Sequence, residues 1–318
     1  SEYLNLFSGH LTFIWHGGEP LLAGLSFFRN VVDIQLKNSK PNQTIHNAIQ
    51  TNATLIDEEW AEFFKKENFR VGVSLDGGAE SHNHFRKNRA GKGSFDQAMG
   101  GIEILRRFGI LSGVIQTITH DSVANAEKDF DFLANTLGIK SWGVNIFLDL
   151  DGINKAMVDQ SITNNDLIRF IKTYIDLWLA KDDSQLRIRE IENFIAGIFK
   201  KRATSCAFNG SCTGYFCLEY NGKIYPCDRS SNYPELLFGD LSRRSLLEIL
   251  NGSTRLQYAE SVNSAHPDCK VCEWNQVCNN GCAMQRMGGI RGKYYYCEAR
   301  KAIFGYLREK IEKFKLTQ

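Results

Sequence analysis

All nine cysteines of this 318-residue chain lie after residue 205, so a thiol-rich C-terminal part is set apart from a body without any. Eight thiols make two sets of four, which suits two zinc sites or two iron–sulfur clusters, and the spacing alone leaves both open. A disulfide framework is typical of small secreted domains that lack a core, and this chain has ample apolar sequence. The eight are Cys206, Cys212, Cys227, the run Cys269-x2-Cys272-x5-Cys278-x3-Cys282, and Cys297.

Composition excludes several classes of protein. A formal net charge of +2 gives no electrostatic reason to expect nucleic acid or an anionic membrane as a partner. No apolar run approaches membrane-spanning length, and no secretory signal opens the sequence. Because the chain begins at Ser1 rather than at methionine, we expect it to be cut or processed at its front.

The body alternates strand and helix patterns, which predicts an α/β fold with a parallel sheet, open or closed into a barrel. We expect Asp57 and Ser94 to cap helices and Gly109 to end one. The expected domains are a barrel-like part over 1–160, bridging helices over 161–203 and a cysteine-rich part over 204–318. Strands are expected at 11–15, 45–54, 70–75, 113–119 and 142–148, and helices at 57–66, 94–108, 124–137, 166–179, 188–200 and 297–314.

Polar residues gather where the predicted strands end, and ligands of parallel α/β folds bind at that edge of the sheet. A glycine pair lets the backbone approach a ligand, and the following glutamate can accept a hydrogen bond from a ligand ammonium. Each segment taken alone also fits a plain turn. The segments are His16-Gly17-Gly18-Glu19-Pro20, Gln50-Thr51-Asn52, Ser74-Leu75-Asp76-Gly77 and Asn145.

In their order along the chain, these motifs resemble the radical S-adenosylmethionine (SAM) enzymes that carry a SPASM domain. The nearest members are anaerobic sulfatase-maturating enzymes and maturases of ribosomally made peptides (RiPP maturases). The resemblance implies a partial (β/α) barrel that binds S-adenosylmethionine and a small SPASM domain with two auxiliary [4Fe–4S] clusters. The matching segments are residues 15–24, 50–56, 73–77 and 225–228, together with the cysteine spacing that includes Gly222-x4-Cys227.

The resemblance also implies roles for residues in the barrel. Gly17, Gly18 and Glu19 would hold the methionine amino end of the cofactor. Ser74 and Arg86 would suit its carboxylate, because a guanidinium binds that group through two hydrogen bonds. Asn52 and Asn145 would contact ribose or adenine, or merely cap the following helices. Asp76 would face the substrate or brace its own turn.

In the SPASM part, the family pattern interleaves the cysteines. The last cysteine of the run would serve the other site, as in some ferredoxins. Cys217 is left over and is expected to be a buried free thiol. The first auxiliary cluster would take Cys206, Cys212, Cys227 and Cys282, and the second would take Cys269, Cys272, Cys278 and Cys297.

Asp228, which follows Cys227, is the expected base that removes a proton from the substrate residue. His16 is the alternative base, and Asp228 could instead accept backbone hydrogen bonds around Cys227. His16 stands where sulfatase-maturating enzymes typically carry glutamine and favours a peptide maturase that oxidises or crosslinks a side chain. Asp228 and the Cys206–Cys212 region favour the alternative, oxidation of Cys or Ser to formylglycine in a sulfatase. A non-enzymatic zinc-binding module is the third possibility.

The family's Cys-x3-Cys-x2-Cys loop for the radical-generating cluster has no counterpart before Cys206. We therefore expect the first barrel strand, the loop and a third cluster to lie outside this sequence, and these 318 residues alone to be unable to cleave S-adenosylmethionine. The resemblance further implies a precursor peptide or protein as substrate, a reductant such as flavodoxin or ferredoxin, and a cytoplasmic location.

Overall fold

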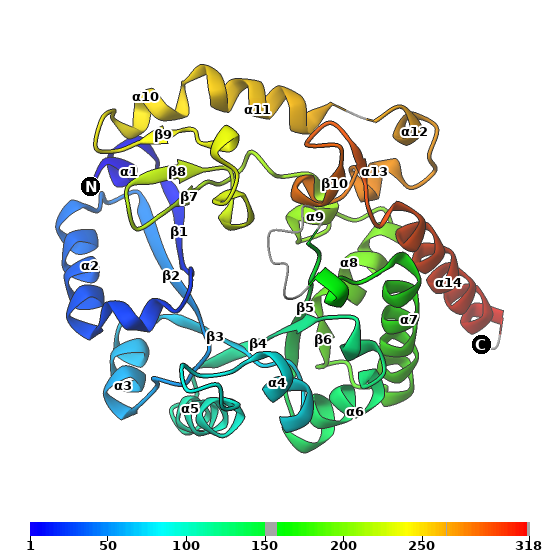
Figure 1. The fold of residues 1–318 in the computed structure, drawn as a ribbon. Helices are drawn as coiled ribbons and strands as arrows, with labels where there is room; N and C mark the ends of the chain where they lie inside the picture. Colours follow the sequence, from blue (N-terminus) through cyan, green and yellow to red (C-terminus); the bar gives the residue numbers. More distant parts are fainter. Residues whose placement is uncertain (150–157, 265, 317–318) are drawn as a thin grey trace. The chain divides into compact units, whose positions relative to one another are not determined.

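The computed structural model describes residues 1–149, 158–264 and 266–316 (Figure 1). Six strands form one sheet in chain order, and the pairs β1–β2, β2–β3 and β3–β4 run parallel. Because the first and last strands are not neighbours in this order, the sheet is open within the described residues. The predicted α/β class is confirmed. The strands are β1 Gly9–Trp15, β2 Gln43–Thr51, β3 Arg70–Ser74, β4 Leu111–Ile118, β5 Ser141–Ile146 and β6 Arg187–Ile188.

The chain divides into two compact units. The first comprises Ser1–Thr117, Asp131–Trp142 and Ser245–Leu247. Its core includes Val71 and Val73 of β3, which are fully buried. Each such side chain contributes roughly 1.5–3 kcal/mol through burial. The first unit's helices before β4 are α1 Glu2–Leu6, α2 Leu25–Asn38, α3 Glu58–Lys66, α4 Ala79–Phe85 and α5 Phe95–Arg107, with a 3-10 turn at Pro20–Ala23.

The helix caps follow the sequence in part. Asp57 caps α3 as predicted, because its Oδ1 accepts a hydrogen bond from Trp60 N at 2.9 Å. Ser94 occupies the position before α5, but its hydroxyl does not cap the helix and instead donates to Arg86 O at 2.9 Å. The Phe95 amide of α5 donates to the side chain of Asn83 at 2.9 Å. The cap therefore comes from a residue eleven positions upstream of Ser94, which local sequence patterns do not reveal.

The second unit comprises Ile118–Phe130, Gly143–Arg244 and Glu248–Gln318. Its long helices are α7 Asn164–Lys181, α8 Arg189–Ile198 and α14 Cys297–Leu316. Helix α14 packs against α7 and α8, and its buried Phe304 stacks on Trp274 with ring centroids 4.6 Å apart. The C-terminal helix expected from the sequence is thereby anchored at the thiol-rich part.

The thiol-rich part is built mostly from short helices and strands, in which no period of hydrophobic residues can be recognised in the sequence. Three strands form one antiparallel sheet and two form another. No helix in the described parts of the chain is long and apolar enough to cross a membrane. The remaining elements are α6 Ala126–Asp131, the π-helix Phe132–Thr136, α9 Cys206–Asn209, β7 Cys217–Leu218, β8 Lys223–Tyr225, β9 Gly239–Asp240, α10 Leu246–Leu250, α11 Ser253–Asn263, α12 Pro267–Lys270, α13 Asn275–Cys278, β10 Arg286–Met287, β11 Lys293–Tyr294, and 3-10 turns at Asp121–Val123, Val158–Gln160, Asp228–Ser230, Pro234–Leu236 and Ala283–Gln285.

Candidate cofactor and cluster sites

Glu19 joins the turn after β1 to the end of β2. Its Oε1 accepts hydrogen bonds from Leu21 N (3.1 Å) and Thr51 Oγ1 (2.7 Å), and its Oε2 accepts one from Asn52 N (2.8 Å). Two of the predicted strand-end motifs therefore lie side by side in the first unit. The carboxylate is already engaged by the chain itself, and its contact with a ligand ammonium stays a prediction.

The glycine pair before Glu19 is open to solvent. A Cβ built at Gly17 or at Gly18 would meet no atom within 4 Å, and Gly17 has a φ of +112°, which favours glycine. His16 is exposed next to them. The backbone of this turn is thus accessible from outside, as the predicted cofactor contact requires.

Asp76, which is buried, forms an ion pair with the partly exposed Arg86. Arg86 Nε donates to Asp76 Oδ2 at 2.5 Å and Arg86 Nη2 donates to Asp76 Oδ1 at 2.9 Å. Asp76 Oδ1 also accepts from Thr117 N at 2.8 Å, and Gln116 Nε2 donates to the Asp76 carbonyl at 3.1 Å. This carboxylate braces its turn, one of the two roles considered for it. The Arg86 fork is occupied by Asp76 in this conformation.

The remaining predicted cofactor residues differ in their surroundings. Ser74 Oγ accepts from Gln50 Nε2 at 3.1 Å, which places the second and third motifs together. Asn52 Oδ1 accepts from Thr54 N at 2.9 Å and so closes a local turn. Asn145 belongs to the second unit, where its Oδ1 accepts from Arg189 Nη2 at 3.0 Å.

His82 is a functional candidate that the sequence did not single out. It is 1% exposed in α4, its Nδ1 accepts from Asp76 N at 3.5 Å, and its Nε2 lies 3.2 Å from Ser94 Oγ. Burial lowers the pKa of His82 to about 4. The negative charge of Asp76 opposes this shift, and the positive charge of Arg86 adds to it. The side chain is therefore neutral and orients the Asp76–Arg86 pair through Ser94.

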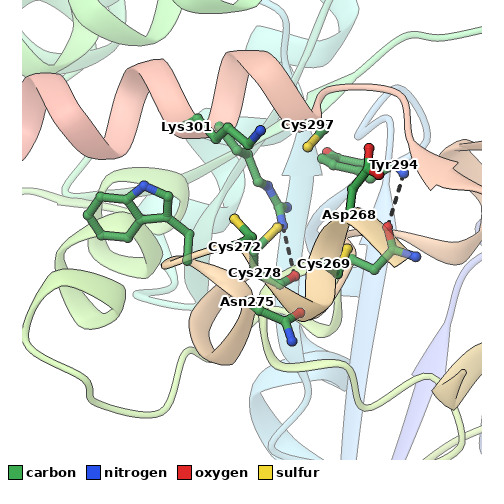
Figure 2. Close-up of a pocket in the computed structure, with 11 residues that line it drawn as sticks. Asp268, Cys269, Cys272, Asn275, Cys278, Tyr294, Cys297 and Lys301 are labelled. Atoms are coloured by element: carbon green, nitrogen blue, oxygen red, sulfur yellow. Dashed lines mark hydrogen bonds between the residues drawn. The ribbon is translucent and has the colours of Figure 1, made fainter. Parts of the chain in front are cut away.

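The four cysteines predicted for the second cluster line one pocket. Figure 2 shows Cys269 from α12, Cys272 from the following turn, Cys278 from the end of α13 and Cys297 from the start of α14. Burial raises the pKa of Cys269, and the charges of Cys278 and Cys272 add to that shift. A cluster held by Cys269 would have to displace the proton of this thiol.

The predicted first set also converges. Burial raises the pKa of Cys212 to about 11, and the charges of Cys282 and Cys206 act in the same direction. Burial raises the pKa of Cys227 to about 12, and Asp228 and Cys282 add to it. Because these groups interact electrostatically, the structure brings together cysteines more than fifty residues apart in sequence. Their assignment as ligands stays a prediction.

A left-handed turn separates the two sets. Asn279, Asn280 and Gly281 follow Cys278 with φ values of 49°, 55° and 59°. A Cβ at Gly281 would lie 2.3 Å from the Tyr294 ring, so only glycine fits there. Asparagine tolerates this conformation better than most residues. The turn leads the chain from the pocket of the second set to Cys282 beside the first.

Cys217 and Asp228 lie near the first set. Cys217 is a free thiol, but it is half-buried rather than buried, and its Sγ donates to Glu219 Oε1 at 3.6 Å instead of packing only against apolar groups. Asp228 is exposed and follows Cys227 at the start of a 3-10 turn. A carboxylate in this place is accessible to a substrate.

The second thiol set fits a four-iron cluster. Within 1–149, 158–264 and 266–316, no three His, Cys, Asp or Glu side chains are close enough to surround one metal ion. A [4Fe–4S] cluster is not such a site, because each of its irons takes a single thiolate. Four cysteines spaced around one pocket match that requirement.

Two family profiles match the chain. The profile of the radical SAM superfamily matches residues 2–133, and the SPASM profile, an iron-sulfur cluster-binding domain, matches residues 206–273. The first match covers the strand-end motifs up to Gly77, and the second covers the cysteines from Cys206 to Cys272. Cys278, Cys282, Cys297 and Asn145 lie outside both matched ranges.

Curated relatives and solved structures agree with the profiles. A cysteine-type anaerobic sulfatase-maturating enzyme of Clostridium perfringens is 30% identical over 95% of this chain and 83% of its own length. A serine-type anaerobic sulfatase-maturating enzyme of Bacteroides thetaiotaomicron is 28% identical over 96% of this chain and 78% of its own length. The structure of native anSMEcpe with bound AdoMet and Cp18Cys peptide superposes with a TM-score of 0.87 at 27% identity, covering 100% of this chain and 89% of that one.

Proposed function

Since this chain belongs to the radical SAM enzymes that carry a SPASM domain, we propose that it oxidises a Cys or Ser side chain in a sulfatase to formylglycine. The observation that carries this proposal is the likeness to sulfatase-maturating enzymes of both types over nearly the whole chain. The exposed Asp228 beside the first thiol set supports it.

The cofactor is proposed to bind where the first-unit strands end. Gly17 and Gly18 offer an open backbone, and Glu19 and Ser74 lie beside the ends of β2 and β3. We retain Arg86, Asn52 and Asn145 as further proposed contacts. The division at 1–160, 161–203 and 204–318 is likewise proposed, as is a small reductant such as flavodoxin or ferredoxin.

Cofactor binding is tested with two substitutions. Glu19→Gln removes the charge that holds Asn52 N and Thr51, and Ser74→Ala removes a hydroxyl at the end of β3. We expect both to weaken S-adenosylmethionine binding about tenfold or more, since a lost charge-assisted hydrogen bond costs about 1.5–3 kcal/mol. Isothermal titration measures the affinity. Glu59→Gln, in an exposed ion pair with Arg29, is the matched control and should bind normally. Normal affinity in both test variants would show that these motifs are only turns.

When bound, the cofactors supply a radical that abstracts one hydrogen atom and an exit for one electron. The protein has to hold the substrate residue and accept its remaining proton. Asp228 is accessible for that transfer and lies at the first thiol set. A carboxylate within hydrogen-bond reach of the substrate residue is sufficient for general-base catalysis.

Asp228→Asn tests this role in an enzyme preparation that cleaves S-adenosylmethionine. We expect cofactor cleavage to continue and peptide product to fall at least about a hundredfold, the usual effect of losing a general base. Glu235→Gln, an exposed carboxylate seven residues later, is the control and should leave the product yield unchanged. Unchanged product in Asp228→Asn would mean that the base is another residue, such as His16.

A peptide maturase that oxidises or crosslinks side chains is the second candidate, because His16 replaces the glutamine typical of sulfatase maturation. Mass spectrometry of peptides containing Cys or Ser separates the two. An aldehyde that reacts with a hydrazine supports formylglycine formation. Loss of two hydrogens without an aldehyde supports crosslinking.

A further inference from the structure

Arg300 is a buried cation next to the second thiol set. Its side chain leaves α14 and is 3% exposed. The guanidinium lies 3.8 Å from the Phe208 ring centroid and 4.5 Å from that of Tyr294. Its Nη1 donates to Ala207 O at 2.7 Å, to Cys278 O at 3.2 Å and to Cys278 Sγ at 3.3 Å. One nitrogen thus contacts the sulfur of a predicted cluster ligand.

This cation has no carboxylate partner among the ion pairs of the described residues. Arginine stays protonated in proteins, and burying its charge without a counter-charge is strongly unfavourable. Two carbonyls and two rings offer it dipoles but no negative charge. Four thiolates around a bound cluster supply that charge directly beside Nη1.

We propose that Arg300 positions the Cys278 sulfur and raises the reduction potential of the cluster held by Cys269, Cys272, Cys278 and Cys297. Reduction adds one negative charge to the cluster, and a fixed positive charge beside a ligand sulfur stabilises the reduced form more than the oxidised form. Hydrogen bonds to sulfur and local charge are the levers that set such potentials. A raised potential makes the second cluster the better acceptor for an electron that leaves the substrate. The proposal rests on the proposed cluster-dependent reaction and on the predicted ligand set of the second cluster, and not on the identity of the substrate.

Arg308, two turns further along α14, is a matched comparison. Its guanidinium lies 4.8 Å from the Trp274 ring centroid, a cation–π contact like those of Arg300 with Phe208 and Tyr294. It differs in being exposed and in pairing with Glu273 Oε2 at 3.0 Å. An exposed and neutralised charge is screened by solvent and has little effect on a cluster.

The test is a redox titration followed by electron paramagnetic resonance on the reconstituted holoprotein. In Arg300→Gln, we expect one of the two auxiliary clusters to become harder to reduce. At a fixed potential its reduced-to-oxidised ratio should fall about tenfold, which is about 59 mV for one electron. Arg300→Lys keeps the charge and should retain most of the potential, and Arg308→Gln should titrate like the unmodified protein. Unchanged midpoints in Arg300→Gln, or equal shifts of both clusters, overturn the proposal.

A measurement on the unmodified protein covers the case in which Arg300→Gln does not hold its clusters. With 15N-labelled arginine, pulsed electron paramagnetic resonance of the reduced holoprotein should detect coupling between one cluster and a guanidinium nitrogen. Absence of that coupling overturns the contact with Cys278. Iron and sulfide analysis keeps the two proposals apart: about eight of each are expected for two clusters. About four would refute the ligand assignment itself, whatever the potentials.

Discussion

At the scale of single residues, the buried His82 makes stability depend on pH. The pKa of His82 falls from 6.5 to about 4 in the folded protein because burial disfavours its charged form. The unfolded chain therefore binds a proton that the native state does not. The stabilisation is complete above about pH 6.5 and is lost as the pH falls toward 4, with a slope of about 1.4 kcal/mol per pH unit.

His82→Gln should remove this slope, which urea unfolding between pH 4.5 and 7.5 measures. His84→Gln is the control, because His84 is an exposed residue on the same helix. It should unfold with the slope of the unmodified protein. The assignment fails if the two variants show the same dependence on pH.

The strand-end residues show how far the sequence could define the candidate site. The order of the motifs predicted which segments meet, and the hydrogen bonds of Glu19 and Ser74 join three of them. The order of the motifs did not predict that Arg86 binds Asp76. It also did not predict the hydrogen bonds that join His82 to Asp76 and to Ser94. These contacts depend on where α4 ends and on the chain beyond it, which no local pattern specifies.

At the scale of elements, segments with a local sequence signal were predictable, and segments without one were not. Strand β3 has buried residues alternating with partly exposed ones and helix α3 has a capping aspartate, so both carry a local signal. Helices α2 and α11 were not predicted, because α2 follows Gly24 without a side-chain cap and α11 buries only Tyr258 and Val262. The strands of the thiol-rich part have two or three residues, too few for a period to appear.

Two adjacent glycines of α5 give a test of element packing. A Cβ at Gly101 would lie 2.1 Å from Ala53 O, the residue after the Gln50-Thr51-Asn52 motif, whereas a Cβ at Gly100 meets nothing within 4 Å. Gly101→Ala should destabilise the protein by about 1–3 kcal/mol, because α5 or the turn must move. Gly100→Ala should stabilise it by about 0.5–1 kcal/mol through helix propensity.

Chemical denaturation of the two variants measures both changes against the unmodified protein. If Gly101→Ala is as stable as Gly100→Ala, the close approach of α5 to the turn at Ala53 does not exist in solution. Weaker S-adenosylmethionine binding in Gly101→Ala alone would show that this approach also maintains the strand-end turn.

At the scale of the whole molecule, the family likeness and the sheet order agree with the class of fold that the sequence predicts. The substrate was less accessible to sequence reasoning. Composition does not distinguish a segment of a sulfatase from a short precursor peptide. His16 and Asp228 favour different substrates, and the curated relatives reported above are sulfatase-maturating enzymes.

The left-handed turn at residues 279–281 has a consequence for how the molecule matures. Cys278 and Cys282 are four residues apart, yet they are proposed to bind different clusters. When a cluster binds one of these two cysteines, it therefore orders the segment that carries the other. Closing the chain around the second cluster then costs less conformational entropy. Loading should be cooperative. Native mass spectrometry during reconstitution with limiting iron should find mostly empty and doubly loaded molecules. An abundant species with one cluster would show that the two sites fill independently.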